Sequence, residues 1–175
     1  DTKYTDNRGT VELRAAAADY LTKFDLHYDK QDEILITMGA SEGIDLALRT
    51  LVNPGEEVLV AEPSYVSYIP CIELCGGVPV SLKLRAENKF RLTREQLEEK
   101  ITEKSKVLLI SYPNNPTGAI MEKEDLEAIA EVVKEHDLFV ITDEIYAELT
   151  YGKKHVSIAS LPGMKERTIV INGFS

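Results

Sequence analysis

Short apolar runs alternate with longer amphipathic segments along this chain. The apolar runs predict strands at residues 34–37, 57–61, 78–82, 106–110, 138–142 and 168–171. The amphipathic segments predict helices at residues 10–24, 41–52, 65–75, 93–100 and 123–135. This alternation is typical of β-α-β units and a mainly parallel sheet. We therefore predict an α/β fold with three α-β-α layers.

The unusual clusters of this sequence all follow predicted strands. They are 39-GASEG-43, 62-EPSY-65, 112-YPNNPTG-118, 143-DEIY-146 and 172-NGFS-175. The carboxyl ends of parallel strands meet at one edge of a sheet, where helix N-termini also point and where open α/β sheets bind their ligands. We therefore expect one site at this edge.

The first cluster passes from strand to helix through small residues. Backbone N–H groups at Ala40 and the hydroxyl of Ser41 could converge there on an anion such as phosphate. Ser41 could equally be an N-cap, since serine favours that position. No Gly-Lys-Ser/Thr follows, and the glycine spacing of a dinucleotide site is missing. A bound phosphate would therefore belong to a smaller cofactor.

Asp143 closes a predicted buried strand, where desolvation makes an unpaired charge costly. We expect a cationic partner for it; the alternative is an exposed acid that caps the next turn. Tyr146 lies three residues further on and would share this side of a helical turn, unless it is an ordinary core residue. These two side chains are candidates for one pocket.

Two further segments offer groups for a planar ligand. Tyr65 is predicted to begin a helix and could cover a flat ring, but a core stripe with Val66, Tyr68 and Ile69 explains this segment better by itself. In residues 112–118 two prolines fix φ and bar a helix, while two asparagines tolerate turn angles and offer amides. We interpret residues 112–118 as a rigid bracket that holds an amide, rather than a plain turn.

Composition narrows the range of partners. The chain has 175 residues, a net charge of −10 and a pI near 4.8, which disfavours a nucleic-acid partner. No apolar run approaches the roughly 20 residues that cross a bilayer, and the first residues lack a signal-peptide pattern. We expect a cytoplasmic protein without a membrane partner. Cys71 and Cys75 lack nearby histidines, so we expect buried free thiols and no metal site.

Together and in this order, the five clusters resemble class I/II aminotransferases of fold type I, which use pyridoxal 5′-phosphate (PLP). The resemblance extends from 4-YTDNRG-9 to the last residue and implies the major domain of a PLP-dependent transferase. The implied cofactor contacts are Ala40 and Ser41 on the phosphate, Tyr65 on the pyridine ring, Asn115 and Tyr146 on the phenolic oxygen, Asp143 on the ring nitrogen, and Tyr4 on the phosphate of a neighbouring subunit. The role of Tyr4 implies a homodimer with shared sites.

The implied chemistry explains these residue types. Removal of the α proton of an amino acid leaves a carbanion, and the ring accepts its charge while the ring nitrogen stays protonated, which a buried Asp143 would ensure. Hydrogen bonds from Asn115 and Tyr146 to the phenolic oxygen would tune the basicity of the cofactor's imine.

The chain also departs from the family pattern. Gly173 stands where some members place a serine for the phosphate. The lysine that holds PLP as a Schiff base would follow Ser175, so we assign no catalytic residue. The amino-terminal arm and the carboxyl-terminal small domain, which carries the substrate-binding arginine, are also absent from this sequence. We therefore expect residues 1–175 to be a piece of the large domain that binds PLP weakly at best and catalyses nothing. We also expect a gap in the sheet between residues 34–37 and 168–171, where the family places an antiparallel strand.

The expected function of the family is transfer of an amino group from an amino acid to a 2-oxo acid. One alternative is a C–S β-lyase on the same scaffold, although such enzymes often carry histidine where Asn114 stands. Others are an aminotransferase-like sensor domain of a transcription regulator, and a nucleotide-binding module in which Asp143 has no special role. Aspartate, aromatic and acetylated diamino acids all remain open as amino donors.

Overall fold

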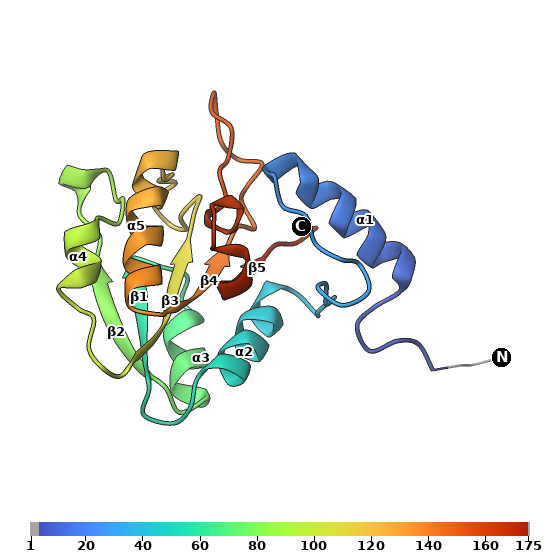
Figure 1. The fold of residues 1–175 in the computed structure, drawn as a ribbon, viewed down its shortest axis with the longest axis horizontal. Coiled ribbons are helices and arrows are strands. Elements are labelled where there is room, and N and C mark those ends of the chain that lie inside the picture. The colour runs from blue at the N-terminus through green and yellow to red at the C-terminus, as the bar shows by residue number, and fades with distance from the viewer. Residues whose placement is uncertain (1–3, 175) are drawn as a thin grey trace.

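A computed structural model describes residues 4–174, which form one five-stranded sheet flanked by helices (Figure 1). The strands are β1 (Glu57–Glu62), β2 (Val78–Lys83), β3 (Ser105–Ser111), β4 (Phe139–Asp143) and β5 (Thr168–Ile171). The α-helices are α1 (Val11–Leu21), α2 (Ala40–Leu51), α3 (Tyr68–Leu74), α4 (Arg94–Glu98) and α5 (Lys123–Glu135). Short 3-10 helices are η1 (Thr22–Phe24), η2 (Ala86–Asn88), η3 (Ile158–Ser160) and η4 (Lys165–Arg167).

The sheet has the order β2-β1-β3-β4-β5, and every strand pair is parallel. The predicted α/β fold with a parallel sheet is thus confirmed. The strand register places Ser111 of β3 beside Asp143 of β4, and Asp143 beside Ile171 of β5. Because the strands run the same way, the segments that follow β3, β4 and β5 leave the sheet at one common edge.

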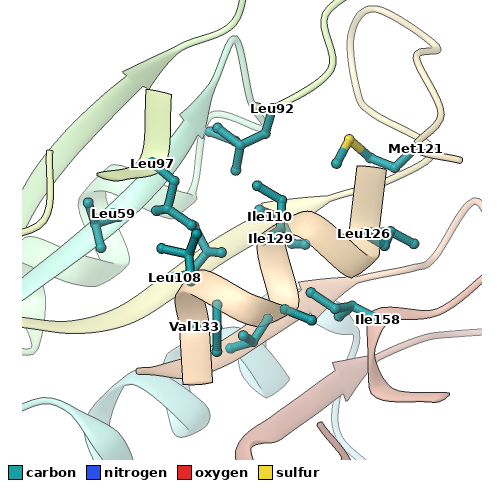
Figure 2. Packing of buried hydrophobic residues seen from close by; sticks show 14 of the residues in the cluster. Leu59, Leu92, Leu97, Leu108, Ile110, Met121, Leu126, Ile129, Val133 and Ile158 are labelled. Carbon is teal, nitrogen blue, oxygen red and sulfur yellow. The ribbon is translucent and has the colours of Figure 1, made fainter. Parts of the chain in front are cut away.

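Helices cover both faces of the sheet, which confirms the three layers (Figure 1). Side chains alternate between the faces along each strand. Leu59, Leu108 and Ile110 lie on the face that α4 and α5 cover, and Figure 2 shows Leu97, Ile129 and Val133 of these helices packed in the same cluster. Val58, Val60, Leu109 and Ile141 lie on the other face with Ile44 and Leu48 of α2 and Ile72 of α3. The alternating burial leaves the strand ends as the places where polar side chains can gather.

The strand predicted at residues 34–37 is wrong, because this segment joins no ladder among residues 4–174. Its Ile36 N–H donates to the carbonyl of Arg8 at 3.0 Å. A Cβ added to Gly9 would lie 2.5 Å from Cγ1 of Ile36, so the segment packs tightly on the preceding part of the chain. Within the described residues β5 pairs with β4 alone and forms an edge of the sheet. The gap expected between residues 34–37 and 168–171 stays a prediction.

The third predicted helix begins later than expected. We predicted a start at Tyr65, whereas α3 begins at Tyr68 and leaves Tyr65 and Val66 exposed. Pro70 explains the shift: it lacks an N–H, so it would break a helix already begun at Tyr65 but is tolerated in the first turn of one that begins at Tyr68. The proposed core stripe is therefore wrong for Tyr65 and Val66, whereas Tyr68 is buried.

The other predicted helices are present with small differences at their ends. The helix predicted at residues 10–24 begins as expected, since Thr10 Oγ1 accepts a hydrogen bond from the N–H of Leu13 at 3.3 Å, and it divides into α1 and η1.

Cys71 and Cys75 are free but half-buried rather than buried, because α3 has one side open to solvent. No helix between residues 4 and 174 combines the length and the hydrophobicity that spanning a membrane requires.

Candidate functional site

A cavity of about 260 Å³ opens at the carboxyl ends of β3 and β4. Six of the seven side chains or backbone positions predicted as cofactor contacts line it: Ala40, Ser41, Tyr65, Asn115, Asp143 and Tyr146. Its volume lies just below the range of roughly 300–1,000 Å³ typical of small-molecule sites. The structure thus brings together at one edge segments that are up to about a hundred residues apart in the sequence.

Tyr4 is the one predicted cofactor contact that does not lie at the cavity. Its side chain is fully exposed and does not line the cavity. The first described residues, before α1, extend away from the sheet (Figure 1). Its predicted role toward a neighbouring subunit therefore stays a prediction.

The cavity wall nearest the predicted phosphate contacts is the start of α2. Gly39 holds the N-cap position with φ at 84°, so Ser41 is not the N-cap that we considered as an alternative. A positive φ favours glycine here. The N–H groups of Ala40 and Ser41 lie in the first helical turn, where they have no intrahelical acceptor. Together with the helix dipole, they form a place where an anion is favoured.

Asp143 is the one buried carboxylate that lines this cavity, with 5% of its surface exposed. Its Oδ2 accepts a hydrogen bond from the hydroxyl of Tyr68 at 2.6 Å, and its Oδ1 accepts one from the N–H of Ile145 at 3.1 Å. No ion pair reaches it among residues 4–174, so the expected cationic partner is not found there. The alternative of an exposed acid is also wrong, because the side chain is buried.

The burial of Asp143 shifts its titration. Desolvation raises the pKa of this carboxyl, and the hydrogen bonds from Tyr68 and Ile145 oppose that rise without cancelling it. An adjacent positive charge would therefore be stabilised strongly by this carboxylate.

Tyr68 is the residue that sequence reasoning missed. We placed it in a core stripe, and its ring is indeed buried, but its hydroxyl reaches the cavity wall and contacts Asp143. The available signal was its position three residues after Tyr65, on the same side of a helical turn, together with the need of Asp143 for a partner. Other lining residues that were not predicted as cofactor contacts are Met38, Ile44, Ser111 and Ile145.

The two asparagines of the bracket at residues 112–118 differ in their surroundings. Asn114 is buried: its Nδ2 donates to the carbonyl of Pro63 at 3.1 Å, and its Oδ1 accepts from the Thr117 hydroxyl at 2.7 Å. Asn115 is half-buried and lines the cavity. Asn114 thus stabilises the bracket, which presents the Asn115 residue to the cavity as the bracket interpretation predicted.

A second buried polar cluster lies directly behind Asp143. Glu144 is 1% exposed, and its Oε2 lies 2.8 Å from His155 Nε2. Its Oε1 accepts hydrogen bonds from Ser157 at 2.7 Å and from Thr142 at 3.1 Å. Because the N–H of Glu144 also donates to the carbonyl of Ile171 at 2.8 Å, this cluster holds the end of β4 in place.

These features fit a cofactor with an anionic group and a flat ring that carries a basic nitrogen. The start of α2 offers N–H donors for the anionic group, Tyr65 offers an aromatic face that is 41% exposed, and Asp143 offers a buried carboxylate to the nitrogen. Tyr146, which is 36% exposed, and Asn115 offer neutral hydrogen-bonding groups.

Comparison with known proteins agrees with this arrangement. The family model for aminotransferase class I and II matches residues 1–175. The Bacillus subtilis (strain 168) protein YugH is 50% identical over 175 residues, a match that covers 99% of this chain and 45% of YugH. The aspartate aminotransferase of Pyrococcus abyssi (strain GE5 / Orsay) is 47% identical over 176 residues, which are 99% of this chain and 45% of that enzyme.

A solved structure shows the same fold. The crystal structure of an aromatic aminotransferase from Pyrococcus horikoshii OT3 has a TM-score of 0.96 and 45% sequence identity, and the match covers 99% of this chain and 47% of that one. The chain therefore spans about half the length of the relatives that it matches.

Proposed function

Because this chain belongs to the family of class I and II aminotransferases, we propose that the full-length protein moves an amino group from an amino acid to a 2-oxo acid. Enzymes of this family use PLP, and the architecture described above is that of their fold type I major domain. Residues 1–175 are part of this large, cofactor-binding domain in our proposal, in keeping with the half-length matches.

The observation that carries the proposal is the buried carboxylate of Asp143 at the cavity. No cationic side chain among residues 4–174 forms an ion pair with it. An unpaired buried charge is costly, so proteins keep one where a ligand compensates it. The protonated ring nitrogen of PLP is such a ligand. In our proposal Asp143 holds the proton on that nitrogen.

The remaining contacts follow from what each group can donate. The N–H groups of Ala40 and Ser41 bind the phosphate, and Tyr65 covers one face of the ring. Asn115 and Tyr146 donate to the phenolic oxygen. Each of these groups lines the same cavity, which supports their joint assignment.

When bound, PLP supplies a conjugated ring that accepts the electron pair left behind when the α hydrogen of the amino acid departs as a proton. Asp143 favours this by keeping a positive charge at the ring nitrogen. The hydrogen bonds from Asn115 and Tyr146 place partial positive charge beside the phenolic oxygen. The buried cluster around Glu144 keeps Asp143 and Tyr146 at fixed positions, because it anchors the turn that carries both.

Among residues 4–174, no lysine that could hold PLP as a Schiff base lines the cavity. We therefore propose that residues 1–175 by themselves bind PLP weakly and do not catalyse transfer. We also propose a cytoplasmic homodimer for the full-length protein, in which Tyr4 reaches the phosphate site of the partner subunit.

The amino donor remains open within the amino acids. Of the relatives described above, one is an aspartate aminotransferase and one is an aromatic aminotransferase, at 47% and 45% identity. The C–S lyase and the regulator are not favoured, since the similar proteins are aminotransferases. Asn114 also fits the transaminase pattern, and its amide is engaged on both sides, by the carbonyl of Pro63 and by the hydroxyl of Thr117.

The test uses the full-length protein. Purified protein is titrated with PLP by absorbance, then supplied with ¹⁵N-labelled aspartate or phenylalanine and 2-oxoglutarate. We expect saturable PLP binding and the appearance of ¹⁵N in glutamate, detected by mass spectrometry. Protein that binds PLP but moves no label from any amino acid would refute the transfer, and protein that does not bind PLP would refute the cofactor assignment.

A further inference from the structure

Tyr68 makes an unusual use of its hydroxyl. The side chain is 1% exposed and begins α3, and its O–H donates to Oδ2 of Asp143 across 75 positions of sequence. The distance of 2.6 Å is typical of a hydroxyl donating to an ionised carboxylate. The other oxygen of Asp143 accepts from the N–H of Ile145, so a donor on each oxygen fixes the plane of the carboxylate.

The ring of Tyr68 has a second neighbour in the cavity wall. Its ring meets that of Tyr65 edge to face, with centroids 5.9 Å apart and planes at 71°. Tyr65 is 41% exposed, and this ring contact constrains its orientation. A single side chain therefore touches the carboxylate and the aromatic ring that line the same cavity.

Another buried tyrosine shows that this arrangement is not required for burial. Tyr112 is 4% exposed, yet its hydroxyl donates to the carbonyl of Phe90 at 3.0 Å and accepts from the N–H of Leu92 at 3.1 Å. These partners are backbone groups in the cluster that α4 and α5 cover. Tyr112 thus satisfies its hydroxyl within the core, whereas Tyr68 directs its hydroxyl to the one buried carboxylate at the cavity.

We propose that Tyr68 is a positioning residue: its hydroxyl orients Asp143 toward the ring nitrogen of PLP while its ring orients Tyr65 over the ring face. This inference rests on the proposed function, since it assumes that PLP occupies the cavity. Tyr68 itself does not exchange a proton in this role. Burial, and next the charge of Asp143, raise the pKa of the Tyr68 hydroxyl, so it remains a donor at neutral pH.

Tyr68→Phe in the full-length protein tests the hydroxyl alone, and Tyr112→Phe is the matched control because it also deletes a buried hydroxyl. We expect Tyr68→Phe to weaken PLP binding about 10-fold, the effect of losing one hydrogen bond to a charged group. Tyr112→Phe should leave PLP affinity within about 2-fold of the wild type, even if it lowers the thermal midpoint. Tyr68→Leu, which also removes the contact with Tyr65, should weaken binding further.

A second measurement on the apoprotein does not depend on the cofactor. ¹³C NMR follows the titration of the Asp143 carboxyl, with the resonance assigned by its loss in Asp143→Asn. Tyr68→Phe removes a hydrogen bond that favours the charged form, so the pKa of Asp143 should rise. A merely structural role for Tyr68 would not move this titration, and Tyr112→Phe should not move it either.

The outcomes separate this inference from the proposed function. If wild-type protein does not bind PLP, the proposed function fails first and the inference fails with it. If the wild type binds PLP and Tyr68→Phe binds equally well, or leaves the titration of Asp143 unchanged, the inference is overturned while the proposed function stands. If Tyr68→Phe does not fold, the ¹³Cζ resonance of Tyr68 is compared in wild type and Asp143→Asn: a shift supports the contact, and an unchanged resonance overturns it.

Discussion

Asp143 allows the sharpest test of the site, because its carboxylate is buried and pairs with no cation among residues 4–174. Asp143→Asn keeps the shape of the side chain and removes its charge. In the proposed function the substitution removes a charged hydrogen bond to the ring nitrogen of PLP. Hydrogen bonds to charged groups contribute about 1.5–3 kcal/mol, so PLP should bind about 10- to 150-fold more weakly.

The same substitution should have the opposite effect on the stability of the apoprotein. Burial raises the pKa of Asp143 above the ordinary value of 3.8, so between that value and the raised one the folded state binds more protons than the unfolded state. Apoprotein stability therefore falls as pH rises through this interval, and the loss persists at neutral pH. Asparagine does not titrate, so Asp143→Asn should remove this loss and stabilise the apoprotein at neutral pH.

The assay combines PLP titration of the full-length protein with urea unfolding of its apo form from acidic to neutral pH. Asp19→Asn, at an exposed position on α1, is the control and should change neither quantity. Unchanged PLP affinity in Asp143→Asn would refute the assignment of the carboxylate to the cofactor. An apoprotein that is less stable at neutral pH would refute the argument from burial.

Four further substitutions test the framework of the fold and the cavity. Arg14→Met should lower the free energy of unfolding by about 3–5 kcal/mol in urea, because the fully buried guanidinium donates to three backbone carbonyls and a carboxylate. A decrease below about 1 kcal/mol, the range of an exposed ion pair, would contradict this. His155→Phe should lower the free energy of unfolding by about 3 kcal/mol, since it leaves the buried Glu144 with hydroxyl partners alone. An unchanged free energy of unfolding in the same assay would show that the pair of His155 and Glu144 is dispensable. Asn114→Ala should lower the free energy of unfolding by about 1–3 kcal/mol through its lost hydrogen bonds, whereas Asn115→Ala should weaken PLP binding with little effect on stability; the reverse pattern would exchange their roles.

Local patterns in the sequence were sufficient for the element types and their order. The run at 107–110 is buried on both faces of the sheet, as its continuous hydrophobicity indicated. Five predicted strands are present, because short apolar runs between polar turns have few other ways to be buried. The segment at 34–37 has the same local pattern, but a strand also needs a neighbour to complete its hydrogen bonds, and a single run does not reveal one.

The site followed from the sequence to a similar extent. Clusters after strand ends had to meet at one edge once the sheet was parallel, and six predicted contacts line one cavity. The family resemblance had already pointed to Asn115 as the asparagine at the cavity, whereas the role of Asn114 in stabilising the bracket was decided by the fold. Tyr4 lies apart because nothing in the described chain packs against its side chain.

The partner of Asp143 shows most clearly where sequence stops and tertiary structure begins. From the sequence alone, a carboxylate that ends a buried strand was expected to have a cationic partner, because desolvation of a charge is costly wherever it occurs. That its partner within the described chain is instead the hydroxyl of Tyr68 depends on how α3 lies across the end of the sheet, with its start shifted by Pro70. Hydrophobic periodicity reports which residues are buried, whereas the distance between two buried polar atoms far apart in the chain is set only when the helices pack.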